Sequence, residues 1–160
     1  MTSPAEDVPP EFREAVAELL YHSQMIEALL RVYLSDVNEA ADLVLQREGV
    51  RFKSRERDFQ KPLRQLVRLF ESHSDNHDLI RRLQSFVEHR NTAAHTAYVW
   101  GFVNRERPEQ VAGALKKVRT HCAEGRALVE AITVEVVKTH ELKTSPRLRL
   151  AAIGEKPDTE

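Results

Sequence analysis

Residues 77–101 read HDLIRRLQSFVEHRNTAAHTAYVWG, and their apolar side chains recur at spacings of three and four. That spacing is typical of one face of an amphipathic α-helix. The residues before it, SHSDN at 72–76, are cap and turn formers, and Gly101 suits the end of a helix. The stretch therefore predicts a separate helix over residues 77–101.

The same periodicity extends outward in both directions and predicts the other helices. It favours helices over 11–34, over 37–45 after a break at Ser35–Asp36, over 62–70 and over 107–142. Residues 49–61 are polar, basic and without a period, which indicates a loop. No strand is expected, because the one β-branched run, 132–137, lies inside the last helical pattern. We expect an all-α fold, an antiparallel bundle of four to five helices.

The chain has 160 residues, enough for one domain of ordinary size and too few for two. Charged residues make up 31% and hydrophobic residues 41%, which is typical of a globular chain rather than a disordered one. We expect a flexible lead-in over residues 1–10, a single helical bundle over 11–142 and a loose tail over 143–160.

Composition excludes several classes of protein. The formal net charge is −1, which excludes a uniformly basic nucleic-acid binder but allows a local basic patch. A single cysteine, Cys122, excludes an internal disulfide framework and fits a reducing compartment. No apolar run reaches the ~18 residues of a membrane span, and the acidic N-terminus lacks the features of a signal peptide. We expect a cytoplasmic protein with no membrane contact.

The residue pattern gives little support to several common catalytic centres. The seven histidines do not combine with carboxylates at metal-ligand spacing on neighbouring helices, so no metal or other cofactor is expected. Most of these histidines are expected at the surface. Cys122 falls on the apolar face of the last helix, which indicates a core residue rather than a nucleophile. Five scattered glycines cannot build a phosphate-binding loop.

The remaining candidate site lies late in the 77–101 helix. Arg90 continues the apolar stripe of this helix, so its charge falls on a line that packing should bury. A buried guanidinium requires a partner or a cleft. Asn91 and His95 are four residues apart on one face, where the amide can hold the imidazole in one tautomer. Alanines keep this turn thin, so that another helix or a ligand can approach; they are Ala93, Ala94 and Ala97.

The spacing of Arg90 and His95 carries little weight alone. Three Arg–His pairs in the chain are separated by four to six residues: Arg68–His73, Arg82–His89 and Arg90–His95. The first pair runs off the end of a helix into a polar turn, and the second lies among ordinary helix-surface residues. Context favours the third pair, because its arginine lies on the apolar stripe.

The string Arg90-Asn91-Thr92-Ala93-Ala94-His95 resembles the motif of the HEPN superfamily. These small helical proteins carry Arg-x4-6-His, commonly with Asn after the Arg. The order of elements is similar too: a long first helix with an acidic residue, here Glu27, then the motif late in a helix, then a last long helix. The resemblance covers roughly residues 11–140, and its specific part is the six-residue string.

The resemblance implies a metal-independent endoribonuclease that acts as a homodimer, with two motifs facing each other across one cleft. A histidine of near-neutral pKa can take the proton of the RNA 2′-hydroxyl, and a guanidinium can hold the phosphate. His95 is then the general base or acid, Arg90 the phosphate clamp and Asn91 the residue that orients the imidazole. A toxin–antitoxin or phage-defence role, with an antitoxin or regulatory protein as partner, is also implied.

Two further sets of residues surround this motif. Tyr98 stands three residues after His95, whereas some HEPN toxins carry His-x-Tyr with a tyrosine that a partner modifies, so that form of regulation is not carried over. Tyr98 remains a supporting residue that can stack a base or, as is more common for such a residue, pack in the core or at the dimer interface. The basic loop supplies candidate RNA contacts at Arg51, Lys53, Arg55 and Arg57.

Other functions stay open at this point. One alternative is a catalytically silent HEPN-like helical module for interaction or regulation, in which Arg90 and Asn91 simply bond Glu27 or a helix terminus. A third is nucleotide binding without cleavage. An Arg90 and His95 pair packed within one protomer, with no open cleft, would favour the silent module.

Overall fold

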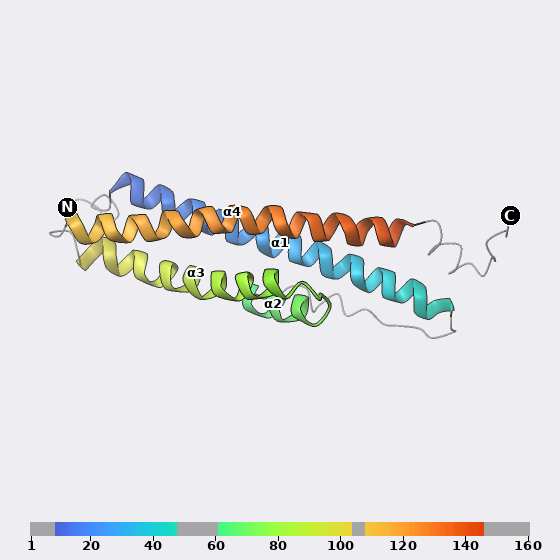
Figure 1. The fold of residues 1–160 in the computed structure, drawn as a ribbon. Coiled ribbons are helices and arrows are strands. Elements are labelled where there is room, and N and C mark those ends of the chain that lie inside the picture. The colour runs from blue at the N-terminus through green and yellow to red at the C-terminus, as the bar shows by residue number, and fades with distance from the viewer. Residues whose placement is uncertain (1–8, 48–60, 104–107, 146–160) are drawn as a thin grey trace.

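The computed structural model describes residues 9–47, 61–103 and 108–145, with side-chain detail over 9–46, 61–93 and 109–145. Four helices form in these ranges (Figure 1): α1 (Pro10–Arg47), α2 (Leu63–Glu71), α3 (His77–Val103) and α4 (Pro108–Thr144). The described chain contains no strand, so the prediction of an all-α fold is confirmed.

The helices α1 and α4 run side by side and in the same direction over most of their length (Figure 1). Ion pairs cross their seam at a nearly constant offset in sequence: Glu11–Arg119 at 3.7 Å, Glu18–Arg126 at 3.0 Å and Asp36–Lys143 at 2.5 Å. A constant offset is what two parallel helices produce. The prediction of an antiparallel bundle is therefore wrong for this pair.

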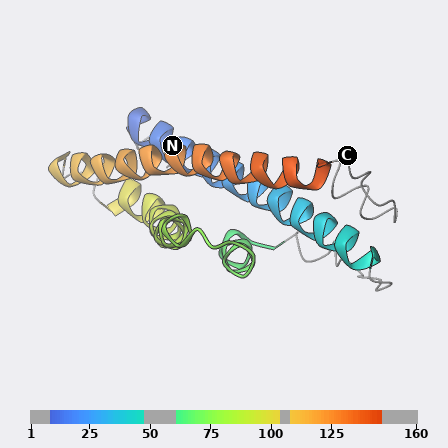
Figure 2. The same cartoon turned by 45° about the vertical axis from the view of Figure 1, so that its right-hand side comes forward.

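The position at which α2 begins explains the parallel pair. Arg31, in the middle of α1, donates to the main-chain oxygen of Lys61 at 3.4 Å, so the chain lies beside the middle of α1 just before α2. The helices α2 and α3 then form an antiparallel hairpin, which Arg64 and Glu88 bridge. Because α3 runs back along α1, the next helix, α4, runs parallel to α1. Figure 2 shows α2 and α3 together on one side of the α1–α4 pair.

The core lies where all four helices meet. Its fully buried side chains come from each helix: Leu19, Ile26, Leu30 and Leu34 of α1, Leu66 and Phe70 of α2, Leu83 and Phe86 of α3, and Leu128 and Ile132 of α4. Burial of each such side chain stabilises the fold by roughly 1.5–3 kcal/mol compared with leaving it in water. Tyr33 packs edge-on against Phe70, with ring centroids 4.8 Å apart, and ties α2 to α1. The short α2 is therefore held by its apolar face.

The predicted break at Ser35–Asp36 is wrong, because α1 continues without interruption to Arg47. Asp36 is buried at the seam, where its carboxylate accepts from Lys143 Nζ at 2.5 Å and lies 3.2 Å from His140 Nδ1. These partners lie more than 100 residues away in the chain. A residue that favours a helix start in isolation serves here as an interhelical anchor.

The other boundaries lie close to the predicted ones. The helix α3 passes through Gly101 and ends two residues later, and α4 covers 108–144 against the predicted 107–142. The β-branched run at 132–137 is helical, as expected. No helix within the described ranges combines the length and the hydropathy that crossing a membrane would require.

Candidate functional site

Arg90 follows a buried stripe on α3. Leu79, Leu83, Phe86 and Val87 precede it at helical spacing and belong to the core. Arg90 lies one turn after Phe86 and is half-buried. A long aliphatic stem can continue an apolar stripe while its charged head reaches the margin of the core. The fold thus holds a permanent positive charge at that margin.

The guanidinium of Arg90 is only partly satisfied. Its Nη1 donates to Asn91 Oδ1 at 3.2 Å. Its Nε is buried and has no hydrogen-bond partner among the residues that the structure describes. A buried N–H without a partner costs about 1–3 kcal/mol, and more on a charged group. An unpartnered buried group of this kind calls for an explanation, such as a bound water, an ion or a ligand.

Asn91 and His95 lie four residues apart in the unbroken α3 backbone, which puts them on the same helix face. Asn91 is half-buried, and its carbonyl oxygen is oriented by the bond from Arg90. The side chains of His95 and Tyr98 lie outside the described residues. The four predicted RNA contacts also lie outside them: Arg51, Lys53, Arg55 and Arg57.

Glu27 does not join this cluster. Its carboxylate accepts from Arg31 at 3.1 Å, one turn further along α1. Arg31 in turn bonds the main chain before α2, so Glu27 helps to place α2 against α1. Within the described part of the chain, neither Arg90 nor Asn91 bonds Glu27. Of the two pairings that would give the motif a purely structural role, with Glu27 or with a helix terminus, the first is therefore absent from the described residues.

Two histidines that sequence reasoning left aside stack across the α3–α4 seam beside Arg90. The rings of His89 and His121 have centroids 4.2 Å apart and planes inclined by 17°. Burial, and then the neighbouring His89, lower the pKa of His121. His121 is consequently neutral at pH 7. Because His121 is distant from the motif in sequence, the sequence did not indicate that its ring would lie against His89.

The second Arg–His pair has a structural role. Arg82 Nε donates to Glu124 Oε1 at 2.9 Å, and this hydrogen bond raises the pKa of the arginine further. The bond joins α3 to α4. In the first pair, His73 follows the end of α2, where its Nδ1 lies 2.8 Å from the main-chain oxygen of Leu69. Neither contact resembles the unsatisfied guanidinium of Arg90.

A glycine allows the three long helices to approach one another near the motif. A Cβ on Gly125 of α4 would lie 2.9 Å from His22 Cβ of α1 and 3.0 Å from the Phe86 ring of α3. His22 is buried, and its Nδ1 has no hydrogen-bond partner in the described ranges. His22 is an exception to the expected surface histidines, and Gly125 provides the space for it.

Cys122 is a core residue, as predicted. It is buried on α4 and its Sγ lies 3.2 Å from the main-chain oxygen of Ala15, to which it donates. Burial raises the pKa of the thiol to about 11, so it is not a thiolate at pH 7. Among the described residues, no group of three or more His, Cys, Asp or Glu side chains has the arrangement of a metal site.

Comparison of the chain with known protein families, with characterised proteins and with solved structures found no match. The functional interpretation therefore depends on the motif and on its surroundings in the fold.

Proposed function

We propose that this protein is a metal-independent endoribonuclease of the HEPN type, which cleaves RNA by transesterification across the cleft of a homodimer. The observation that carries the proposal is the half-buried Arg90, whose guanidinium is oriented by Asn91 and keeps an unpartnered N–H. A group held in this way is prepared to bind an anion with little reorganisation.

The chemistry needs no cofactor, because RNA carries its own nucleophile. His95 takes the proton of the 2′-hydroxyl as general base, and the oxygen attacks the adjacent phosphorus. The bond to the 5′-oxygen breaks, which leaves a 2′,3′-cyclic phosphate on one fragment and a 5′-hydroxyl on the other. Arg90 stabilises the charge that gathers on the phosphate. One Arg and one His are few groups for two proton transfers, and a two-fold axis doubles them.

Cleavage of RNA in the presence of EDTA tests the proposal. We expect His95→Ala to reduce the rate at least about 100-fold, the usual contribution of a general acid or base. His73→Ala is the matched control, because His73 follows Arg68 at the same spacing. Equal loss in both variants, or activity that persists in His95→Ala, would exclude the motif as the active site.

The same contact also fits a second function, a catalytically silent helical module for interaction or regulation, because Arg90 Nη1 is bonded within its own helix. Expression in cells separates the two functions. Toxicity that Arg90→Ala relieves supports the nuclease, with a toxin role and an antitoxin partner. Normal growth at high expression supports the silent module.

A further inference from the structure

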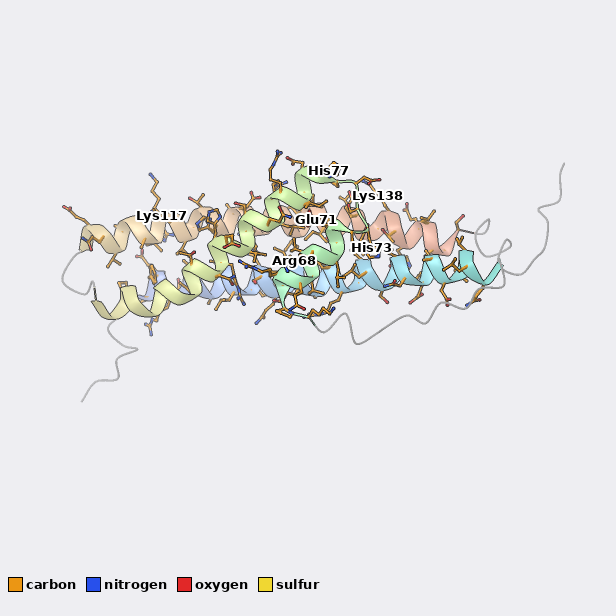
Figure 3. All side chains as sticks on the ribbon, turned by 90° about the horizontal axis from the view of Figure 1, so that it is seen from below. Arg68, Glu71, His73, His77, Lys117 and Lys138 are labelled. Atoms are coloured by element: carbon orange, nitrogen blue, oxygen red, sulfur yellow. The ribbon has the colours of Figure 1, made fainter. Side chains whose placement is uncertain are left out.

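The α1–α4 pair has an outer face, opposite the side that α2 and α3 cover, and no helix of the described ranges lies on it (Figure 2). Figure 3 views the molecule from the covered side. Tyr21 and Val32 of α1 and Val134 of α4 each follow a fully buried residue by two positions. Two positions turn an α-helix by about 200°, so these side chains point away from the core. Together with Val137 they are 46–58% exposed, and such a cluster is typical of an interaction surface.

The outer face of α1 carries no charge between Glu14 and Glu39, a distance of about seven turns. A helix face that stays in water normally carries charged side chains. Two of its residues, Ala17 and Ala28, are small and exposed, which allows another helix to approach closely. The composition of this face therefore favours contact with a helix. Its side chains are Ala17, Tyr21, Gln24, Met25, Ala28, Val32 and Ser35.

The charges that border the outer face on α4 alternate in sign along the helix. Arg126 is followed by Glu130, Lys138 and Glu141, and Figure 3 labels Lys138 at the edge of α4. If a second α4 runs antiparallel across the first, Arg126 meets Glu141 and Glu130 meets Lys138. Both pairs are centred within one residue of Val134. The charge order of α4 is thus complementary to itself in reverse.

These charges are available for such a contact. Glu130 and Glu141 are exposed and have no ion-pair partner in the described chain. Arg126 bonds Glu18 at 3.0 Å and Lys138 bonds its neighbour on α4 at 3.1 Å, but both cations are more than 60% exposed. Exposed ion pairs contribute little to stability, so a new carboxylate can share or replace the present one.

The apolar residues of α1 have the same centre as the charges of α4. The seam pair of Asp36 and Lys143 relates the two helices by an offset of 107 residues. With this offset, the midpoint of Tyr21 and Val32 lies at the level of Val134. A single two-fold axis at that level therefore serves both helices.

We infer that the outer face binds a second copy of this chain through an antiparallel two-fold contact, with α1 on α1 and α4 on α4. Tyr21 then packs on the partner's Val32, and Ala28 lies next to the axis. A two-fold contact requires a surface that is complementary to itself, and this face has that property in both its charges and its apolar residues. The inference does not rest on the proposed function, because the motif is on α3, across the α1–α4 pair. A chain that makes both contacts assembles beyond a dimer.

A cysteine beside the axis tests the geometry. Ala28→Cys should form a disulfide-linked dimer under mild oxidation, because its two copies meet at the axis. Ala17→Cys is the matched control: it changes an exposed alanine of the same face, but its two copies lie about 28 Å apart along the helices. The natural Cys122 is buried and should not react. No dimer from Ala28→Cys, or equal yields from both variants, would overturn the inference.

Reversal of the charges tests the pairing on α4. Glu130→Lys should weaken self-association at least about fivefold, measured by sedimentation equilibrium, because it places like charges opposite each other twice in each dimer. Adding Lys138→Glu to that variant restores opposite signs and should recover the association. A folding defect cannot produce that recovery. Equal weakening in the single and double variants would contradict the antiparallel pairing.

A charge within the apolar part tests the contact itself. Val32→Glu should lower the association constant at least about tenfold, because the contact would bury a carboxylate without a partner. The control is Val44→Glu, an exposed valine of α1 that lies about 120° around the helix from Val32. A monomeric wild type, or unchanged association in Val32→Glu, would overturn the inference. A wild type that associates as expected but leaves RNA intact would exclude the nuclease and support this contact.

Discussion

At the α1–α4 seam, Glu11, Glu18 and Asp36 each meet a cation of the opposite helix, whereas Arg90 on α3 keeps a buried Nε without a partner among the described residues. The three pairs follow the direction and register of the two helices, and among these carboxylates only Asp36 is buried. The α3 stripe instead places a charge at a half-buried position directly after the buried Leu83 and Phe86. This comparison separates charges that stabilise the fold from charges that are available for chemistry. Three substitutions and one change of pH test that distinction.

The largest effect is expected at the seam. Asp36→Asn keeps the volume but removes the buried charge that faces Lys143 and His140. We expect a loss of about 2 kcal/mol in the free energy of unfolding, less than for a fully isolated buried pair, because Glu39 still binds Lys143 at 3.0 Å. Urea unfolding measures it. Glu14→Gln, an exposed change on α1, should alter stability by less than about 0.5 kcal/mol, and equal effects would contradict the distinction.

Gly125→Ala should destabilise the fold by about 1–2 kcal/mol, because its Cβ would meet His22 Cβ at 2.9 Å and the relief requires α1 or α4 to shift. Thermal unfolding measures the effect. The matched change is Gly113→Ala on the same helix, where nothing lies within 4 Å of the new Cβ. That variant should gain about 0.5–1 kcal/mol from helix propensity. A loss in Gly113→Ala, or a gain in Gly125→Ala, would show that the close approach is absent.

Arg90→Met should keep or raise the stability of the protein and abolish its proposed activity. Methionine fills the buried part of the stem and removes the unpartnered Nε, so we expect unchanged or higher stability, by up to about 1 kcal/mol. RNA cleavage should be lost. Stability and cleavage measured on the same preparation decide between the two roles. A loss of several kcal/mol would show that Arg90 serves the fold as Asp36 does.

The smallest effect concerns pH. The pKa of His121 is lowered in the folded protein from 6.5, so the unfolded state binds a proton more readily. The free energy of unfolding should therefore have its full value above about pH 7 and fall as the pH drops below 6.5. His121→Phe keeps a ring against His89 and should flatten that fall, which unfolding curves at pH 7 and pH 5 can detect. The same pH dependence in His121→Phe and wild type would assign it to other groups.

The sequence predicted the features that depend on local pattern. The α3 stripe, the turn at 72–76 and the burial of Cys122 all follow from apolar spacing and cap residues. Arg90 was expected at a buried line, and it is half-buried there. Whether Arg90 and His95 form an active site remains a prediction.

The features that were not predicted depend on residues distant in the chain. At Asp36, where a break was expected, α1 is continuous and the carboxylate pairs with Lys143, 107 residues later. The burial of His22 depends on Gly125, and the stack at His89 depends on His121. Local periodicity carries no information about these partners, since it fixes the face of a helix but not the helix that covers it.

The most direct measurement is the chemistry of the RNA ends after incubation with the purified full chain in EDTA. Mass spectrometry of the fragments should find 2′,3′-cyclic phosphates paired with 5′-hydroxyl ends for wild type, and intact RNA for folded Arg90→Met. Fragments with 3′-hydroxyl ends, or the same fragments from Arg90→Met, would contradict cleavage by this motif.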